Sequence, residues 1–215
     1  MIEKGKVICF EGGDKAGKYT QAMALKNWLI SKGVCCEYVS YPRYENPEAG
    51  PIINILKGDF GLLENFDPYL MTTLYAHDRA KDKPRIDKLL ADGVWIIFDR
   101  YVYSNMAYQC SRSKAHTNSH LLDFIYNLEF YVHGLNKPDI VFYIKTDDAL
   151  RKARIEQDGA DDDFEKSDSL QSRVSKMYDV IAEKYNFKVI ESGNSSKEEI
   201  SIQIIEHINS FLKVA

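Results

Sequence analysis

Residues 11–20 of the chain read Glu-Gly-Gly-Asp-Lys-Ala-Gly-Lys-Tyr-Thr, directly after the apolar run Val7 to Phe10. Two glycines and Lys18 have the G-x-x-x-x-G-K spacing of a phosphate-binding loop, or P-loop, that opens a helix. In such a loop the backbone N–H groups and the helix dipole converge on phosphate, and the lysine reaches its oxygens. The alternative is a glycine-rich turn that only joins strand to helix. We expect a nucleoside triphosphate to contact Gly12, Gly13, Asp14, Lys15, Ala16, Gly17, Lys18, Tyr19 and Thr20.

Tyr19 departs from this motif, because Ser or Thr normally follows the lysine and places a short hydroxyl on magnesium. A phenolic oxygen lies too far from its backbone to substitute for that hydroxyl. Thr20 is no simple replacement, since it points about 100° further round the helix. We therefore predict that Mg²⁺ is held mainly through waters and through carboxylates, chiefly Asp99 with help from Asp14.

Apolar runs of strand length recur along the chain, with long helical patterns between them. They cover Val7 to Phe10, Val34 to Val39, Val94 to Phe98, Ile140 to Ile144 and Phe187 to Ile190. Strands that alternate with helices indicate a parallel sheet covered on both faces. The sequence thus predicts an α/β fold of the P-loop NTPase type, a three-layer sandwich with a five-stranded parallel sheet. No linker-like stretch divides residues 1–215, so we expect a single domain.

Two helix ends are marked by their residues. Gly33 closes a helix that begins near Gly17, and Ser196 with Glu199 forms a capping box before the last helix. Apolar residues from Ile200 onward recur there at helical spacing, while the polar face is mainly acidic. A membrane-surface helix would have a basic polar face, so we expect this helix to pack on the sheet.

Composition restricts the function classes. The formal net charge is -4, with 28% charged and 45% hydrophobic residues, and no run of lysines or arginines indicates a nucleic-acid partner. No apolar run is long enough for a signal peptide or a membrane span, so we expect a cytoplasmic protein without membrane contact. The four cysteines have no CxxC spacing and are expected to be reduced structural residues.

A second set of polar residues follows the strands. Asp99 and Arg100 come directly after the run Val94 to Phe98, at the edge where open α/β sheets bind ligands. The planar fork of Arg100 suits a monophosphate, and Asp99 suits a magnesium-bound water, although a strand-end salt bridge is the simpler alternative. Arg43, after the second strand, either meets the same phosphate or lies at the surface. Tyr75 and Arg79 lie four residues apart on one face of a predicted helix, which places an aromatic ring and a guanidinium side by side. Taken singly, Tyr75 would be a core residue and Arg79 a solvent-exposed charge.

The segments EGGDKAGKYT, YPRY, LYAHDRA, DRYVYSNMAYQ and NKPD, in this order and spacing, resemble the thymidylate kinase family. The resemblance covers nearly the whole chain, from about Lys6 to the final helix. The DRYxxS segment and the upstream DR helix are its discriminating parts, because P-loops occur in many unrelated NTPases. The resemblance implies transfer of the γ-phosphoryl group of ATP to dTMP, with Mg²⁺, in a homodimer.

It also implies a pocket for dTMP. Tyr75 would stack on thymine and Arg79 would donate to its O4, where cytosine carries an amino group. Arg43 and Arg100 resemble the phosphate-binding arginines of the family, and Asp14 resembles the carboxylate near the sugar 3′-hydroxyl. Tyr101, Asn105 and Tyr108 would lie on one face of the helix that follows; without the resemblance, these residues could serve only to pack that helix. The implied dTMP contacts are Asp14, Arg43, Tyr75, Arg79, Arg100, Ser104, Asn105 and Tyr108.

Family members close a lid over the donor phosphates, usually with arginines that offset charge during transfer. Here the expected lid, about residues 155–170, contains no arginine and is rich in aspartate, so a solvated acidic loop is the alternative. Phe164 and Glu165 resemble positions near base and metal. Lys15 replaces an arginine that some relatives use and lacks its bidentate fork. The expected catalytic groups are Lys18, Arg100, Asp99, Lys15, Arg154 and Arg151.

Two other functions stay open at this level. A kinase of the same fold acting on dUMP or a deoxynucleoside would share most of these motifs. A nucleotide-binding homologue with weakened catalysis would explain Tyr19, Lys15 and the arginine-free lid. Lys18, Asp99, Arg100 and Arg43 together favour an enzyme, since a pure binder has little use for a full set of acceptor-phosphate groups.

Overall fold

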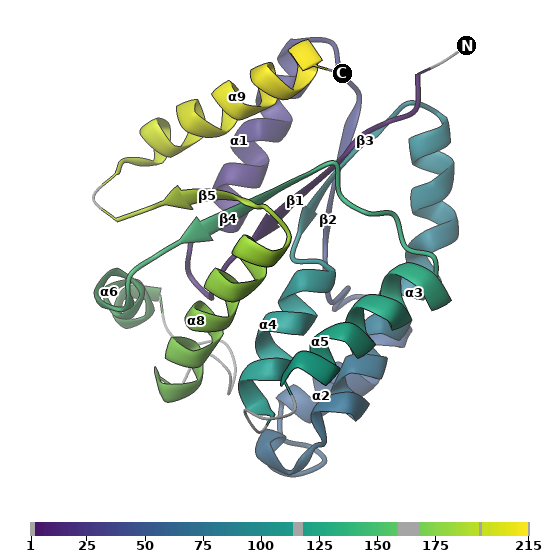
Figure 1. Ribbon diagram of the computed structural model, residues 1–215, viewed down its shortest axis with the longest axis vertical. Helices are drawn as coiled ribbons and strands as arrows, with labels where there is room; N and C mark the ends of the chain where they lie inside the picture. Colours follow the sequence, from purple (N-terminus) through teal and green to yellow (C-terminus); the bar gives the residue numbers. More distant parts are fainter. Residues whose placement is uncertain (1–2, 114–117, 159–167, 194, 215) are drawn as a thin grey trace.

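A computed structural model describes residues 3–113, 118–158, 168–193 and 195–214. Its centre is a five-stranded parallel sheet in the order β2-β3-β1-β4-β5 (Figure 1). The strands are β1 (Val7–Glu11), β2 (Cys36–Ser40), β3 (Trp95–Asp99), β4 (Ile140–Lys145) and β5 (Lys188–Glu191). The predicted five parallel strands are confirmed, with ends that shift by one or two residues.

Helices cover both faces of the sheet (Figure 1). One face carries α1 (Lys18–Ser31) and α9 (Lys197–Val214), and the other carries α3 (Pro68–Ala91), α4 (Val102–Arg112), α5 (Asn118–Tyr126) and α8 (Asp168–Lys184). The sheet therefore has two cores. Ile8 and Phe10 of β1 point to the α1–α9 side, whereas Cys9 points to the other, because successive strand residues face opposite ways.

Shorter elements connect this framework. They are the 3₁₀ turns η1 (Pro47–Ala49) and η2 (Leu63–Asn65), the helices α2 (Gly50–Leu56) and α6 (Asp148–Asp158), and a π-helical segment η4 (Asn127–Val132) that continues α5. Of the expected lid, residues 155–158 end α6 and residues 168–170 begin α8. Residues 159–167 lie outside the described part of the chain.

The predicted helix ends are confirmed. Gly33 has a φ of 78° and its N–H donates to the carbonyl of Ile30 at 2.9 Å, which closes α1. The Glu199 carboxylate accepts from Ser196 N–H at 2.7 Å, and the Ser196 hydroxyl accepts from Glu199 N–H at 3.2 Å. This is the reciprocal capping box, and it starts α9 where its apolar face meets β5 and α1.

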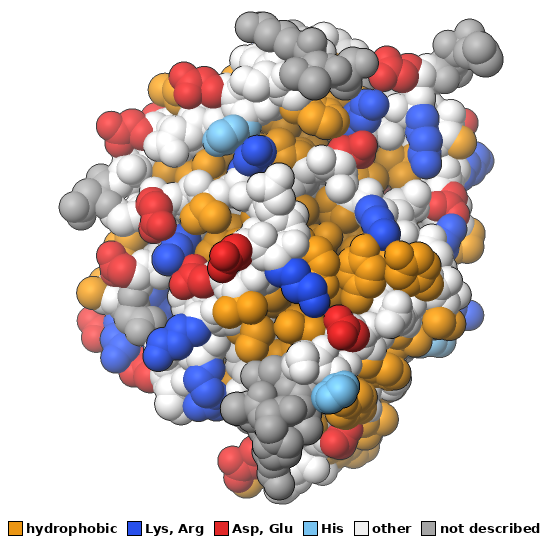
Figure 2. Space-filling model, viewed as in Figure 1, with side chains coloured by type: hydrophobic (Ala, Val, Ile, Leu, Met, Phe, Trp, Pro, Cys, Tyr) orange, Lys and Arg blue, Asp and Glu red, His pale blue; other side chains and the backbone are white. Residues whose placement is uncertain are grey.

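Two surface properties bear on function. Within the described ranges, no helix is long and apolar enough to cross a membrane. On the face shown in Figure 2, lysine and arginine side chains are interspersed with aspartate and glutamate.

The four cysteines are free thiols; Cys9 and Cys110 are buried, and burial raises the pKa of both.

Candidate functional site

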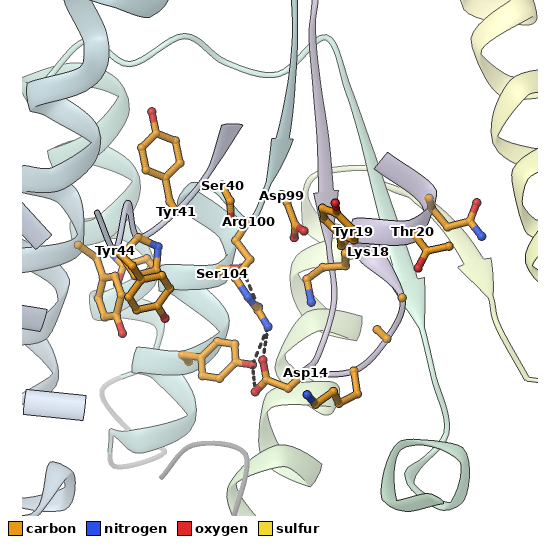
Figure 3. A pocket seen from close by; sticks show the side chains of 18 of the residues that line it. Asp14, Lys18, Tyr19, Thr20, Ser40, Tyr41, Tyr44, Asp99, Arg100 and Ser104 are labelled. Atoms are coloured by element: carbon orange, nitrogen blue, oxygen red, sulfur yellow. Dashed lines mark hydrogen bonds and ion pairs between the residues drawn. The ribbon is translucent and has the colours of Figure 1, made fainter. Parts of the chain in front are cut away.

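A cleft of about 1160 Å³ lies along the carboxyl ends of β1, β2 and β3 (Figure 3). The phosphate-binding loop forms one end of it, and helices α3 and α4 form the other. These carboxyl ends meet because the strands are parallel and β1 lies between β3 and β4. The lining includes Asp14 to Gln21, Ser40 to Pro42, Tyr44, Tyr75, Arg79, Asp99, Arg100, Ser104, Asn105, Tyr108, Gln109 and Arg154.

The backbone of the loop depends on its glycines. Gly12 has a φ of 147°, and a Cβ there would lie 2.5 Å from the carbonyl oxygen of Ile144. Gly17, at the start of α1, has a φ of 94°. Lys15 is left-handed as well, with a φ of 57°, which is uncommon for a residue with a side chain. The loop thus curls tightly from β1 into α1.

Lys18 lies inside this curl. Its Nζ donates to the carbonyl of Gly13 at 2.7 Å, and the side chain is buried. The pKa of Lys18 is lowered to about 8, first because the side chain is buried and then because of the charge of Arg100; together these outweigh the attraction of Asp99 and Asp14. A bound polyphosphate would favour the charged amine, so this lysine is suited to an anion.

Asp14 and Arg100 form the floor of the cleft, where Figure 3 shows them bonded. Arg100 has a φ of 66°, and its Nη1 also donates to Gly12 O at 3.1 Å. Tyr108 OH and Gln171 Nε2 each donate to Asp14 Oδ2 at 2.7 Å. Burial alone would raise the pKa of Asp14, but the charges of Arg100 and Lys18 outweigh it and lower the pKa. Both carboxylate oxygens of Asp14 already accept bonds from protein donors.

Asp99 has different surroundings. It ends β3 and lies next to Lys18 and Tyr19 in Figure 3. Its Oδ2 accepts from Tyr38 OH at 3.0 Å, and the Tyr19 ring meets the Tyr38 ring edge-on at 5.7 Å. Tyr19 is 60% exposed. Asp99 is consequently the better-placed carboxylate for a cation beside the loop.

The other end of the cleft contains buried polar groups. Arg79 is buried and forms a bidentate ion pair with Glu129, at 2.5 Å from Nε and 2.6 Å from Nη2. Asn105 Nδ2 donates to the same carboxylate at 2.9 Å and to Thr72 O at 3.2 Å. Burial opposes the charge of Arg79, but Glu129 outweighs it and raises the pKa of Arg79. Arg79 is therefore no solvated surface charge.

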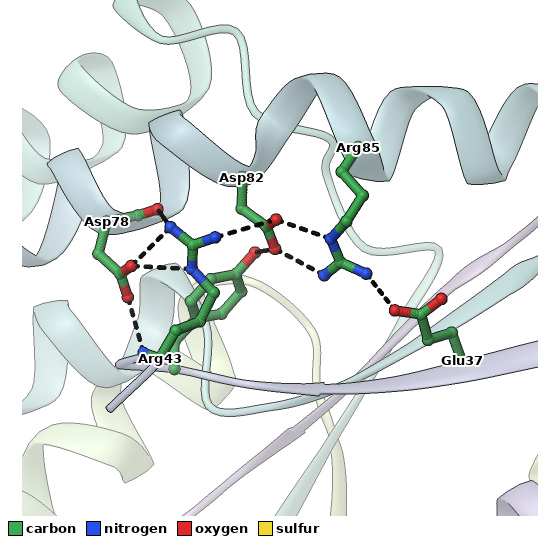
Figure 4. Close-up of polar contacts among 6 residues, drawn as sticks. Glu37, Arg43, Asp78, Asp82 and Arg85 are labelled. Atoms are coloured by element: carbon green, nitrogen blue, oxygen red, sulfur yellow. Dashed lines mark hydrogen bonds and ion pairs between the residues drawn. The ribbon is translucent and has the colours of Figure 1, made fainter. Parts of the chain in front are cut away.

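Arg43 is directed elsewhere. Its Nε donates to Asp78 Oδ1 at 2.9 Å, and its Nη1 lies 3.1 Å from Asp82 Oδ1, in a chain of charges that continues through Arg85 to Glu37 (Figure 4). Among the described residues that line the cleft, Arg43 is missing, although its neighbours Pro42 and Tyr44 are present. The structure does not bring its guanidinium together with Arg100.

The two arginines of α6, Arg151 and Arg154, have different surroundings. Arg154 lines the cleft, and its Nη1 donates to Lys15 O at 2.7 Å. Arg151 is buried and pairs with Asp168 at the start of α8, at 2.5 Å. Phe164 and Glu165 lie outside the described residues. Within those residues, no group of three or more His, Cys, Asp or Glu side chains is arranged to hold a metal ion.

Sequence reasoning missed three residues that bind the side chains of the cleft, namely Glu11, Tyr38 and Glu129. Glu11 is wholly buried and accepts from Tyr101 N–H at 2.9 Å and from Ser104 Oγ at 2.5 Å, which fixes the start of α4. Tyr38 and Glu129 contact Asp99 and Arg79 across long sequence separations. Only Glu11, at the end of a strand and before the loop, carried a local signal.

Comparisons with known proteins identify similar sequences and a similar fold. A family model described as thymidylate kinase matches residues 10–204. A thymidylate kinase of Prochlorococcus marinus is 33% identical over 98% of this chain and 99% of its own length, and one of Dictyostelium discoideum is 29% identical over 99% and 89%. A solved thymidylate kinase of Candida albicans superposes with a TM-score of 0.79 at 22% identity, covering 96% of this chain and 92% of that one. The last match supports the fold.

Proposed function

Because the chain belongs to the thymidylate kinase family, we infer that it transfers the γ-phosphoryl group of ATP to dTMP, giving dTDP and ADP. The single observation that carries this inference in the molecule is the two-ended cleft. A phosphate-binding loop with Lys18 forms one end, and a buried pair, Arg79 and Asn105, forms the other. Transfer between two bound nucleotides requires positioning and charge neutralisation rather than a covalent enzyme intermediate.

We propose that the loop from Gly12 to Thr20 holds the ATP phosphates. Its backbone curls around Lys18, whose charge faces the β and γ oxygens. Arg154 and Lys15 reach the same end of the cleft from either side, and Arg151 fixes α6 against α8. These cations offset charge on the phosphoryl group as it moves.

Magnesium fits this end of the cleft. It demands six oxygens, keeps several waters, and is usually held by one or two carboxylates together with substrate phosphates. Asp99, at the end of β3 and beside Lys18, is the carboxylate we assign to it. When bound, the ion neutralises phosphate charge and orients the donor. Asp14, earlier considered a helper, has both oxygens engaged by Arg100, Tyr108 and Gln171, which favours a role near the sugar.

At the acceptor end we propose that Tyr75 stacks on thymine and that Arg79 donates to O4. Arg100, fixed by Asp14 and Ser104, would bind the acceptor phosphate, and Tyr108 above Asp14 would border the sugar. Arg43 reaches that phosphate only if it shares its N–H groups with Asp78 and Asp82. Arg100 is therefore the principal phosphate ligand in this proposal.

We further propose a cytoplasmic homodimer. The family resemblance motivates it, and several large apolar side chains near the start of α3 are exposed, namely Phe60, Leu62, Tyr69 and Leu70. Burying such side chains against a second copy would be favourable. Light scattering on the purified chain measures the mass directly, and a monomer would reject the proposal.

The test of function is ADP release at saturating ATP and Mg²⁺ with dTMP, dUMP, dCMP and dGMP as acceptors. We expect dTMP to give the highest kcat/KM, with dUMP nearest to it because uracil has the same polar edge. Preference for another acceptor would replace the assignment. Nucleotide binding without ADP release would instead indicate a homologue that no longer catalyses.

A further inference from the structure

Glu129 is a buried carboxylate that the mechanism does not use. It lies on η4, the π-helical segment between α5 and the loop that leads to β4, and it is fully excluded from solvent. Such π-helical turns are rare and often occur at functional sites. Glu129 and Phe130 are the buried residues of this segment, whereas Tyr131 and Val132 are largely exposed.

Glu129 first orients Arg79. Glu129 Oε2 accepts from Arg79 Nε at 2.5 Å, and Glu129 Oε1 accepts from Arg79 Nη2 at 2.6 Å. The planar fork has one more nitrogen, Nη1, which points away from that edge. Because Arg79 lines the cleft, this arrangement leaves a fixed N–H donor for a ligand.

Glu129 also determines which way the Asn105 amide faces. Nδ2 lies between Glu129 Oε1, at 2.9 Å, and Thr72 O, at 3.2 Å. A carboxylate and a carbonyl only accept hydrogen bonds, so the NH₂ group must face them. The amide oxygen, Oδ1, is consequently turned to the other side.

That oxygen has no hydrogen-bond partner among the described residues, although it is buried and Asn105 lines the cleft. A buried acceptor without a donor is costly, and proteins seldom keep one without a reason. A ligand N–H at this place would remove the cost. The cleft is thus lined by two residues bonded to the same Glu129 oxygen, one with a remaining donor, Arg79 Nη1, and one with a remaining acceptor, Asn105 Oδ1.

We propose that Glu129 determines the pyrimidine specificity of this enzyme without touching the base, by fixing that donor and acceptor in this order. Thymine offers O4 as an acceptor and N3–H as a donor, which is the complement of the pair. Cytosine offers the reverse, an amino group at C4 and an unprotonated N3. The inference rests on the proposed function, since it assumes that the base of the acceptor lies at Arg79 and Asn105.

Glu129→Gln tests the proposal, because it keeps the shape and removes one acceptor. The glutamine amide then meets Arg79 or Asn105 with its own NH₂ group, and the Asn105 amide is free to flip and present Nδ2 to the cleft. We expect the ratio of kcat/KM for dTMP to that for dCMP to fall by about 5- to 100-fold, the span of one misplaced buried hydrogen bond. Most of the change should lie in KM.

Asp82→Asn is the matched control at the other charge cluster. It is an equally buried carboxylate that binds Arg43, Arg85 and Tyr41, and it contacts neither Arg79 nor Asn105. We expect it to lower stability and to change both acceptors by the same factor, leaving the ratio as in the wild type. If Asp82→Asn lowered the ratio of kcat/KM for dTMP to that for dCMP as much as Glu129→Gln does, the change would reflect general destabilisation of the protein. That result would overturn the proposal.

The remaining outcomes are also decisive. An unchanged ratio in folded Glu129→Gln enzyme means that Glu129 is structural only. If Glu129→Gln does not fold, Glu129→Asp is used instead, because it keeps the charge but is too short to reach both Arg79 and Asn105. An unchanged ratio in folded Glu129→Asp enzyme likewise means that Glu129 is structural only. A wild type that does not prefer dTMP over dCMP would refute the proposed function instead, before any variant is compared.

Discussion

The two ends of the cleft differ in how their cations are held. At the acceptor end the arginines are paired with carboxylates: Arg79 with Glu129, Arg100 with Asp14, and, behind the cleft, Arg43 with Asp78 and Asp82. At the donor end Lys18 and Arg154 donate to backbone carbonyls of the loop itself. Carboxylates fix orientation and cancel charge, whereas carbonyls leave the full positive charge in place.

This difference matches what each end must do. An acceptor base is recognised by the direction of a few hydrogen bonds, which requires donors that cannot turn. A triphosphate is recognised mainly by its charge, which requires cations that are not already neutralised. In the proposed function, the acceptor end is therefore preformed, and the nucleotide with Mg²⁺ would complete the donor end.

The largest expected effect is at the donor end. Lys18→Ala should lower kcat by about 10³-fold, because it removes the fixed cation that faces the transferred phosphoryl group. Isothermal titration should show dTMP binding nearly unchanged. Lys26→Ala, further along α1 and outside the cleft, is the control and should behave as wild type. A large loss of dTMP affinity in Lys18→Ala would contradict the division between the two ends.

Arg43→Ala probes the preformed end. Removing the guanidinium leaves the buried charge of Asp78 without its ion-pair partner, while Asp82 keeps Arg85; the loss should cost about 3 kcal/mol of unfolding free energy in urea titrations. We also expect KM for dTMP to rise roughly tenfold, as for loss of one charged hydrogen bond. If stability falls while KM is unchanged, Arg43 is a structural clamp and leaves the acceptor site.

Lys15→Ala asks whether the left-handed lysine of the loop takes part in the chemistry. It should lower kcat by about 10-fold while KM for dTMP stays within about twofold, since a point charge near the phosphoryl group acts mainly in the transition state. Steady-state kinetics with either substrate varied separates the two constants. A change in KM alone would exclude Lys15 from the catalytic groups.

The pH dependence of ATP binding follows from Lys18. Its pKa of about 8 means that the amine is charged below this value and becomes neutral above it. KM for ATP should therefore be flat below about pH 7 and rise towards tenfold per unit above about pH 8.5, while KM for dTMP changes less. Lys18→Arg, which stays charged, should remove the rise. A rise that persists in this variant would assign the titration to another group.

Tyr19→Ser should have the smallest effect. A serine there restores the hydroxyl that usually meets magnesium, so the Mg²⁺ concentration for half-maximal rate should fall by about threefold. Tyr19→Phe, which keeps the ring against Tyr38, is the control and should match the wild type. If Tyr19→Ser leaves both magnesium dependence and turnover unchanged, position 19 has no part in holding the metal.

The sequence alone determined the five strands, their parallel arrangement and two of the helix ends. Strand length, helical period, the capping box at Ser196 and the closing glycine Gly33 act within a few residues, so their effects can be derived without knowing what lies nearby. The five strands, the end of α1 and the start of α9 followed from them. The resemblance supplied the site residues as a set, without their orientation.

Only the tertiary structure decided which charges meet. Glu129 lies 50 residues from Arg79, and Asp78 lies 35 from Arg43, and nothing local distinguishes these carboxylates from the other acidic residues of the chain. Packing of α3 against η4 and against the segment after β2 brings these pairs together in the interior, where a charge without its partner is costly. The sequence therefore indicated Arg79 and Asn105 as site residues, and the fold determined which of their atoms Glu129 binds.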